Sequence, residues 1–470
     1  MKKVLLSLLS IIFVLTNINL FAQNSKLDIT ITGVSNSDIF LAHHYGNKQF
    51  INDTIHLDKN GHGILEKDTL FDEGIYLIVL PSKNYFEILL GKDQEFSLKT
   101  NKNDLIKNLK YKGSKENQKF CDYQQYMIDK QSESTDIQKK LHKLDRKSDS
   151  IEILENQLKA IDNEVKNNWE KIADDNQGTL IALIVNSMRN PEIPEIIVPE
   201  NIENKDSVKW FHSYNYNKQH YFDNINLSDV RLLRTPIFHK KMDYYFKKVL
   251  IQNPDTLIKY IDKFINDVSA NDELFTYSIR YFINNFQGTK IMGLDKVFVH
   301  IAEKYYLSGE VDWVSKATIQ KLRENVNKIK PNLIGEIAHD LKMETSTNEY
   351  ARLHDITAKY TLVYFWEPNC GHCKKTTPKI FDIYKKYDRS QFEVFSVYTQ
   401  GNKTEWLEYL NKNNFDWINV YDPYNLTNFR FFYNIYSTPT IYLLDKDKKI
   451  IAKRVDYKTI EKILEQELKE

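Results

Sequence analysis

The spacing of hydrophobic residues changes along the chain, and in the first part it is alternating. Between residues 26 and 112, apolar and polar residues alternate in short runs such as 27–31 and 75–80. Glycine, asparagine and aspartate, which favour tight turns, separate these runs. Because successive side chains of a strand point to opposite faces, this alternation is typical of half-buried strands. The pattern therefore predicts an antiparallel β domain, which we place at residues 23–113.

Beyond Gly113 the apolar residues recur at three- and four-residue steps, which is the period of an amphipathic helix. Residues 137–169 predict one long helix or a helical hairpin. Such a seam can be covered by a second helix of the same chain or by a second copy, and we favour the helix pair within one chain. Three prolines make 190–199 an irregular connection.

Residues 210–328 are rich in aromatic and aliphatic side chains at helical spacing, with a break at 234–236. These aromatics fit the core of packed helices better than they fit a cofactor site. The region predicts a central all-helical domain at residues 114–330.

In the last third of the chain, strand and helix patterns alternate. The predicted strands are 361–366, 391–398, 440–444 and 450–455, and the predicted helices are 370–386, 405–411 and 458–468. Strand–helix–strand followed by a hairpin and a helix indicates an α/β domain, which we place at residues 331–470. The fold class expected for the whole chain is thus α+β multidomain.

The first residues have the pattern of a cleaved secretory signal. Lys2 and Lys3 precede an apolar run from Val4 to Leu15, and a small residue, Ala22, follows a polar break. The run is shorter than the ~20 residues that span a bilayer, so a signal peptide at 1–22 is favoured over a membrane anchor. We expect cleavage after Ala22, export to the periplasm or beyond, and no integral membrane segment afterwards.

Composition and cysteine content exclude some classes of function. The chain carries 65 basic and 64 acidic side chains and is 41% hydrophobic, which is the balance of a soluble globular protein. The absence of a basic excess argues against a nucleic-acid partner. Its 3 cysteines are too few for a disulfide scaffold, but two of them form a Cys-x-x-Cys pair, Cys370 and Cys373.

This pair follows a predicted strand and opens a predicted helix. Free backbone N–H groups at a helix N-terminus favour an anion, so Cys370 is the expected nucleophile for an attack on a disulfide. Cys373, one turn later, is expected to be buried and to resolve the mixed disulfide. His372 between them is expected to lower the pKa of Cys370 and to make the pair more oxidising.

The segment 365–374 resembles the active-site segment of thioredoxin-fold proteins. Pro378 matches the helix proline of that fold, and residues 437–440 match its loop with a cis-proline facing the cysteines. Residues 331–341 resemble the lead-in of the TlpA/ResA-type exported disulfide reductases. The preceding regions resemble, more loosely, accessory regions of such proteins in Bacteroidetes.

The resemblance implies a thiol-disulfide oxidoreductase that reduces or isomerises disulfides in exported proteins. It implies substrate contacts at Trp366, Thr438 and Pro439. We expect no cofactor or metal, and because a reductase must keep its pair reduced, we expect a membrane electron donor as partner. Two departures concern proton transfer: Tyr364 stands where thioredoxins keep a buried aspartate, and Thr376 stands where ResA-type proteins keep a glutamate. Glu367 is a candidate replacement. The lead-in also has His339 where proline is usual.

Several alternatives remain at this point. A zinc site would need further ligands, but there is no second Cys-x-x-Cys, and His339 and His354 are isolated. A peroxidase would need a lone reactive cysteine. Cys121 is most simply a buried apolar residue. The rival function is a partner-binding or assembly factor whose redox site is vestigial or serves only for attachment.

Overall fold

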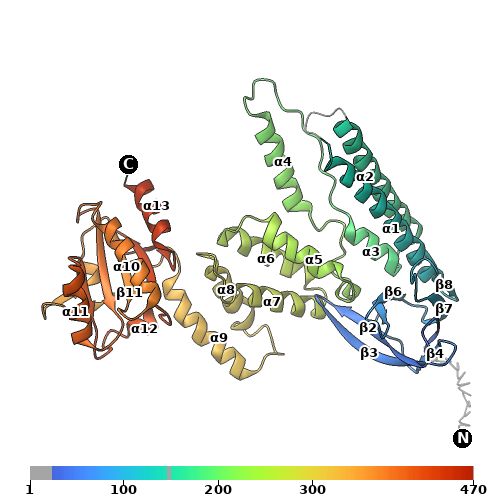
Figure 1. The fold of residues 1–470 in the computed structure, drawn as a ribbon, viewed down its shortest axis with the longest axis horizontal. Helices are drawn as coiled ribbons and strands as arrows, with labels where there is room; N and C mark the ends of the chain where they lie inside the picture. The colour runs from blue at the N-terminus through green and yellow to red at the C-terminus, as the bar shows by residue number, and fades with distance from the viewer. Residues whose placement is uncertain (1–23, 145–149, 469–470) are drawn as a thin grey trace, which may run out of the picture. The chain divides into compact units, whose positions relative to one another are not determined.

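The computed structural model describes residues 24–144 and 150–468, and the chain divides into two compact units, one ending at Tyr245 and one beginning at Phe246 (Figure 1). The predicted signal peptide lies outside the described residues. The division falls inside the helical region that the sequence predicts at 114–330, at a turn of π-helix, Tyr245–Val249. Each unit is therefore described separately.

The first unit begins with two four-stranded sheets, ordered β4-β1-β7-β8 and β3-β2-β5-β6. The strands are β1 Ser25–Thr32, β2 Ser37–Tyr45, β3 Lys48–Leu57, β4 His62–Lys67, β5 Gly74–Val79, β6 Tyr85–Leu90, β7 Glu95–Asn101 and β8 Lys110–Lys112. Leu27, Ile29 and Ile31 of β1 are fully buried, as the alternating pattern predicts. The pairs are antiparallel except that β1 pairs with β7 in parallel. A hairpin turn would force the two strands it joins to be antiparallel, but no hairpin joins β1 to β7, so these two strands can pair in parallel.

The helices of this unit follow directly. They are α1 Lys115–Leu141, α2 Ser150–Asp175, α3 Leu180–Met188, α4 Lys205–His220, the 3₁₀ turn η1 Val230–Arg234 and α5 Ile237–Tyr244. Ser114 caps α1 by accepting a hydrogen bond from the Asn117 N–H. α1 and α2 pack together, and Trp169 Nε1 donates to Tyr123 Oη at 3.2 Å, which confirms the helix pair within one chain.

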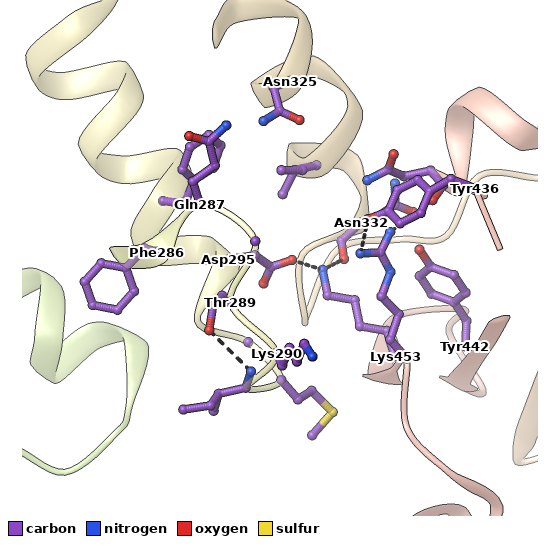
Figure 2. Close-up of a pocket in the computed structure, with 18 residues that line it drawn as sticks. Phe286, Gln287, Thr289, Lys290, Asp295, Asn325, Asn332, Tyr436, Tyr442 and Lys453 are labelled. Carbon is purple, nitrogen blue, oxygen red and sulfur yellow. Dashed lines mark hydrogen bonds and ion pairs between the residues drawn. The ribbon is translucent and has the colours of Figure 1, made fainter. Parts of the chain in front are cut away.

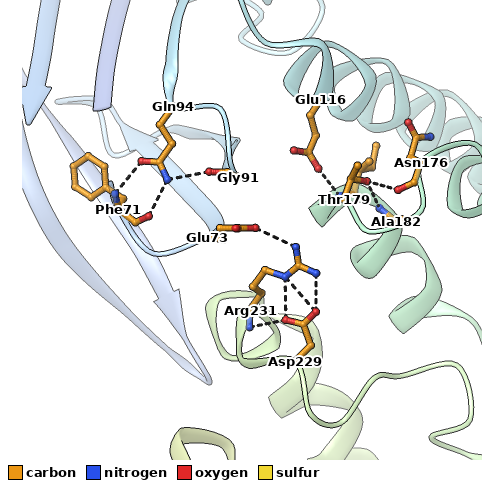
Figure 3. A network of polar contacts seen from close by, with 11 residues as sticks. Phe71, Glu73, Gly91, Gln94, Glu116, Asn176, Thr179, Ala182, Asp229 and Arg231 are labelled. Carbon is orange, nitrogen blue, oxygen red and sulfur yellow. Dashed lines mark hydrogen bonds and ion pairs between the residues drawn. The ribbon is translucent and has the colours of Figure 1, made fainter. Parts of the chain in front are cut away.

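Within the first unit, polar contacts connect the 3₁₀ turn η1 to the strands and connect the helices to one another (Figure 3). Arg231 of η1 forms ion pairs with Asp229 at 2.7 Å and with Glu73, just before β5, at 3.0 Å. Hydrogen bonds to these carboxylates raise the pKa of Arg231 above its ordinary value. Glu116 of α1 accepts from the Ile181 N–H at the start of α3 at 3.0 Å. A 3₁₀ turn thus connects strand and helix at the predicted break.

The second unit opens with helices: α6 Pro254–Val268, α7 Asp272–Phe286, α8 Asp295–Ile301, the π-helical η3 Ala302–Tyr306, α9 Lys316–Ile329 and the turn η4 Lys330–Asn332. Three phenylalanines, Phe246, Phe264 and Phe282, meet edge to face with centroids 4.6–6.0 Å apart. All three are buried, so these aromatics are core residues, as predicted.

The chain then forms a seven-stranded sheet in the order β10-β9-β13-β12-β11-β14-β15. Its elements are β9 Lys342–Thr345, β10 Tyr350–Arg352, η5 Leu353–Asp355, β11 Tyr360–Trp366, α10 Gly371–Tyr384, β12 Phe392–Tyr398, α11 Lys403–Asn413, β13 Ile418–Tyr421, α12 Phe429–Phe432, β14 Thr440–Asp445, β15 Ile450–Lys453 and α13 Tyr457–Glu467. Every residue of β11 is buried. One hydrophobic cluster contains residues of α10, α11 and α13, and the other contains α12, so both faces are covered.

The α+β multidomain fold class is confirmed: sheets come first, helices lie in the middle, and an α/β domain ends the chain. Among the described residues, no helix combines the length and the apolar character needed to cross a membrane.

Candidate active site

Cys370 and Cys373 lie where the central strand β11 gives way to α10. Cys370 is the N-cap of α10, and its sulfur accepts a hydrogen bond from the Cys373 N–H at 3.3 Å. Cys370 is partly buried, whereas Cys373 is only 1% exposed. Both are free thiols. The outer sulfur can be reached by another molecule, and the inner one lies behind it.

The two thiols differ in acidity. Desolvation acts to raise the pKa of Cys370, but hydrogen bonds from the Cys373 thiol and backbone N–H outweigh it, so this pKa lies below its ordinary value. Burial, together with the hydrogen bond to Cys370, raises the pKa of Cys373 to about 12. At neutral pH the outer sulfur is therefore the better nucleophile and the inner one is a protonated donor.

A loop before β14 faces Cys370. The Thr438–Pro439 peptide bond is cis, as the sequence resemblance implied. The Thr438 carbonyl oxygen lies 3.2 Å from Cys370 Sγ, and the Thr438 hydroxyl donates to Glu367 Oε1 at 2.8 Å. Thr438 and Pro439 are both partly exposed beside the reactive sulfur. Their contact with a substrate remains a prediction.

Several loops meet at this edge of the sheet. Because β11, β12 and β13 run parallel, their carboxyl ends lie on one side, and β14 starts there as the antiparallel neighbour of β11. Gln400, after β12, hydrogen-bonds to Glu367, and Asn369 hydrogen-bonds to Glu405 at the start of α11. Gln400, Asn369 and Glu405 were not predicted as site residues from the sequence. Asn369 and Gln400 follow the ends of β11 and β12 closely, and this position is the sequence signal that could have identified them.

Trp366 does not lie at the surface of the site, contrary to the expectation that it contacts substrate. Its side chain is 0% exposed, and its Nε1 donates to Ser396 Oγ at 2.7 Å. The ring packs beside Tyr364, Tyr398 and Tyr409. The reason is that β11 is buried on both faces, so an aromatic residue at its end turns into the core.

His372 is exposed on the first turn of α10, between the two cysteines. Its backbone N–H is among the groups that lower the pKa of Cys370. An effect of its imidazole on that pKa remains a prediction. Pro378 lies inside α10, at the place that the resemblance implied.

Tyr364, which stands where thioredoxins keep a buried aspartate, forms a hydroxyl pair with Thr377. Tyr364 Oη and Thr377 Oγ1 are 2.8 Å apart, and the Thr377 hydroxyl donates to the Cys373 carbonyl at 2.8 Å. Burial raises the pKa of Tyr364 well above its ordinary value, so this phenol stays protonated at neutral pH. It cannot replace a carboxylate as a proton acceptor.

The contacts of the other candidate residues involve none of the site residues described above. In the described part of the chain, no three His, Cys, Asp or Glu side chains form a group that could hold a metal ion. His339 stacks on Phe432, with ring centroids 3.6 Å apart, and His354 Nε2 hydrogen-bonds to the Ala338 carbonyl oxygen. Cys121 belongs to the other unit, where burial raises its pKa to about 11. Cys121 is thus a buried residue, as predicted.

Residues 358–450, which contain both cysteines and the cis-proline loop, match a family described as thioredoxin-like. The C-terminal domain is thioredoxin-like. Residues 152–329 match a second family, a domain of unknown function, DUF5106. The thioredoxin-like domain thus carries the cysteine pair, and the family of the helical region assigns no activity to it.

A curated relative is the "Thioredoxin-like protein" of Haemophilus influenzae, which is 38% identical over 91 residues. The match covers 19% of this chain and 51% of the relative, so the chain spans about half the length of the curated relative it matches.

Two solved structures are also similar. A domain of a possible thiol-disulfide isomerase from Cytophaga hutchinsonii is 39% identical, with 29% of this chain and 94% of that chain covered and a TM-score of 0.28. A thioredoxin-like protein from Bacteroides caccae is 20% identical, with 59% and 98% covered and a TM-score of 0.46.

Proposed function

We propose that the protein is an exported thiol-disulfide oxidoreductase of the TlpA/ResA type, which reduces or isomerises disulfides in other proteins. The observation that carries this proposal is the asymmetry of the pair: Cys370 is accessible with a lowered pKa, and Cys373 is buried with a raised pKa. Such an arrangement lets one sulfur attack first and the other resolve afterwards.

The reaction proceeds in two exchanges. The Cys370 thiolate attacks one sulfur of a substrate disulfide, and the other substrate sulfur leaves as a thiolate that takes up a proton. Cys373 then loses its proton and attacks Cys370, which releases the second substrate thiol and leaves a Cys370–Cys373 disulfide. The substrate gains two electrons and the protein loses two, so a reductase needs a donor to restore the dithiol. A membrane electron donor is the proposed partner.

The cis-proline loop is proposed to position the substrate. The Thr438 backbone lies 3.2 Å from Cys370 and its loop is partly exposed, so an extended substrate segment can hydrogen-bond along it. Pro439 supplies no N–H of its own, which leaves the neighbouring backbone groups as the contacts.

Export rests on the N-terminal sequence pattern. We propose that the protein acts in the periplasm after cleavage behind Ala22, which would leave Gln23 as the first residue. N-terminal sequencing of the protein recovered from the periplasm of a bacterial host tests this, and an uncleaved protein in the cytoplasm would contradict it.

A binding or assembly factor is the second candidate, favoured by the protonated Tyr364 in place of a buried carboxylate. Intact mass after treatment with oxidised glutathione separates the two. We expect the unaltered protein to form its internal disulfide, Cys373→Ser to retain one glutathione, and Cys370→Ser to retain none on this pair. A binding factor with a vestigial site would show the same thiol content before and after treatment.

A further inference from the structure

A pocket of about 630 Å³ lies within the second unit, between the helices and the thioredoxin-like domain (Figure 2). One wall is the α7–α8 connection, residues 287–293, and another is α9. The third comes from the thioredoxin-like domain and includes Tyr436 and Arg454. Figure 2 shows the Asp295 carboxylate directed at the Lys453 ammonium, with which it forms an ion pair.

The pocket continues along the helices. A second pocket of about 530 Å³, between α7 and α9, shares Gln287 and Asn325 with the first. In its lining the Arg280 guanidinium lies over the Trp313 ring, 4.2 Å from the centroid. The two pockets adjoin each other at the shared residues Gln287 and Asn325, and we call their combined lining the α7–α9 groove.

The α7–α9 groove also reaches the loop that faces the reactive cysteine. Tyr436, which lines it, stands two residues before Thr438. The Thr438 carbonyl oxygen is the atom 3.2 Å from Cys370 Sγ. A residue that lines the groove and the carbonyl group that contacts Cys370 thus belong to the same loop.

The lining of the α7–α9 groove is basic and rich in carboxamides. The basic side chains are Arg280, Lys290, Lys321, Lys453 and Arg454. The acidic lining residue is Asp295, which Lys453 already neutralises. Four carboxamides also line it, Asn284, Gln287, Asn325 and Asn434, whereas the buried Asn332 amide already donates to the Lys328 and Phe432 carbonyl groups. This concentration of positive charge stands out in a chain whose net charge is +1.

These features select one kind of occupant. Carboxamides can both donate to and accept from a polypeptide backbone, and the basic side chains attract carboxylates. Lys290, Lys321 and Arg280 are exposed, so their charges face an incoming molecule. Charge complementarity therefore favours an acidic segment over a basic one as the occupant.

We propose that the α7–α9 groove binds an acidic, extended segment of the disulfide-bearing protein that reacts at Cys370. This inference rests on the proposed function and gives it a substrate class. The helical region then contributes specificity to a reaction whose chemistry belongs to the thioredoxin-like domain.

The test compares rates of single-turnover reduction by the full mature chain in its dithiol form. Two probes are peptides, each with a single cysteine and each used as its disulfide-linked homodimer. One peptide has glutamates on either side of the cysteine, and the other has glutamines there. The third probe is hydroxyethyl disulfide, a small neutral substrate. Loss of protein thiols gives the second-order rate constant. We expect the glutamate peptide to react about tenfold faster than the glutamine peptide, equivalent to about 1.4 kcal/mol. The preference should vanish in about 0.5 M salt, where the screening length is roughly 4 Å.

A matched pair of variants locates the effect. Lys290→Gln with Lys321→Gln removes two groove charges, whereas Lys316→Gln with Lys328→Gln removes two exposed charges of α9 that do not line the groove. We expect the first pair alone to abolish the preference for glutamate, with the rate for hydroxyethyl disulfide unchanged in both.

Three outcomes would overturn the inference: equal rates for both peptides, an equal loss in both double variants, or a dimer in sedimentation that Lys290→Gln with Lys321→Gln dissociates. The last would assign the groove to a second copy of the chain. Failure of the proposed function looks different, because hydroxyethyl disulfide would then leave the thiols of the unaltered protein intact.

Discussion

At the scale of single residues, the chemistry depends on two identical thiols that behave differently. Cys370 sits at the start of α10 with a partly exposed sulfur that accepts hydrogen bonds. Cys373, one turn later, is buried among the core residues of the thioredoxin-like domain. The sequence alone predicts this difference, because the strand-to-helix change places one cysteine at the helix N-terminus and the next on its inner face.

The pH dependence of alkylation tests this difference. The thiolate fraction rises with pH, and the pKa of Cys370 is lowered, so iodoacetamide should modify Cys370 with a midpoint below pH 9. Cys373, whose pKa is raised to about 12, should stay unmodified through that range. Mass spectrometry of the digested protein reports each cysteine separately.

Two substitutions at Cys373 provide the matched control. Cys373→Ser keeps a donor beside the Cys370 sulfur, whereas Cys373→Ala removes it. We expect Cys370 to react about fivefold more slowly at pH 7 in the alanine variant than in the serine variant, the effect of losing one hydrogen bond of about 1 kcal/mol. Equal midpoints in the two variants would show that the Cys373 side chain does not stabilise the thiolate.

At the scale of elements, the sequence predicts the long elements and misses the short ones. The strand ending at Trp366, the helix after Cys370 and the closing hairpin are present close to their predicted bounds. β9, β10 and β13 have three or four residues each, too few for a period to be recognised, and their pairing partners are distant in sequence. The burial of Trp366 was missed for a related reason: an apolar run does not reveal which residue faces a loop.

The contact of α8 with β15 gives a second test. Lys453 is 6% exposed and pairs with Asp295, and burial lowers the pKa of Lys453. Asp295→Asn leaves a buried ammonium without its carboxylate, so we expect a loss of about 3 kcal/mol in the free energy of unfolding. Urea denaturation followed by circular dichroism measures it.

The matched control is Asp267→Asn, which removes the partner of Lys263 in an exposed i, i+4 pair of α6. Its expected cost is about 0.5 kcal/mol or less. Similar losses in the two variants would mean that the Asp295–Lys453 pair does not hold the helices to the thioredoxin-like domain.

At the scale of the whole molecule, the chemistry occupies a small part of the chain. The cysteines and the cis-proline loop all lie within residues 358–450. Their arrangement was predictable because a Cys-x-x-Cys pair between a strand and a helix, followed by a Thr-Pro loop before a hairpin, is specific to few folds. The α7–α9 groove was not predictable. Arg280 and Lys290 are far in sequence from Tyr436 and Arg454, and nothing in their spacing indicates that folding brings them to one groove.

The reduction potential of the Cys370–Cys373 pair is the sharpest test of the proposed chemistry. The mature protein is equilibrated with glutathione or dithiothreitol buffers, and its free thiols are then trapped and counted. We predict a reversible two-electron couple within the range of about −270 to −120 mV that thiol-disulfide exchange proteins occupy. Values near the lower end indicate a reductase fed by a donor, and values near the upper end an oxidase or isomerase. A pair without a reversible couple would mean that these two cysteines do not exchange disulfides.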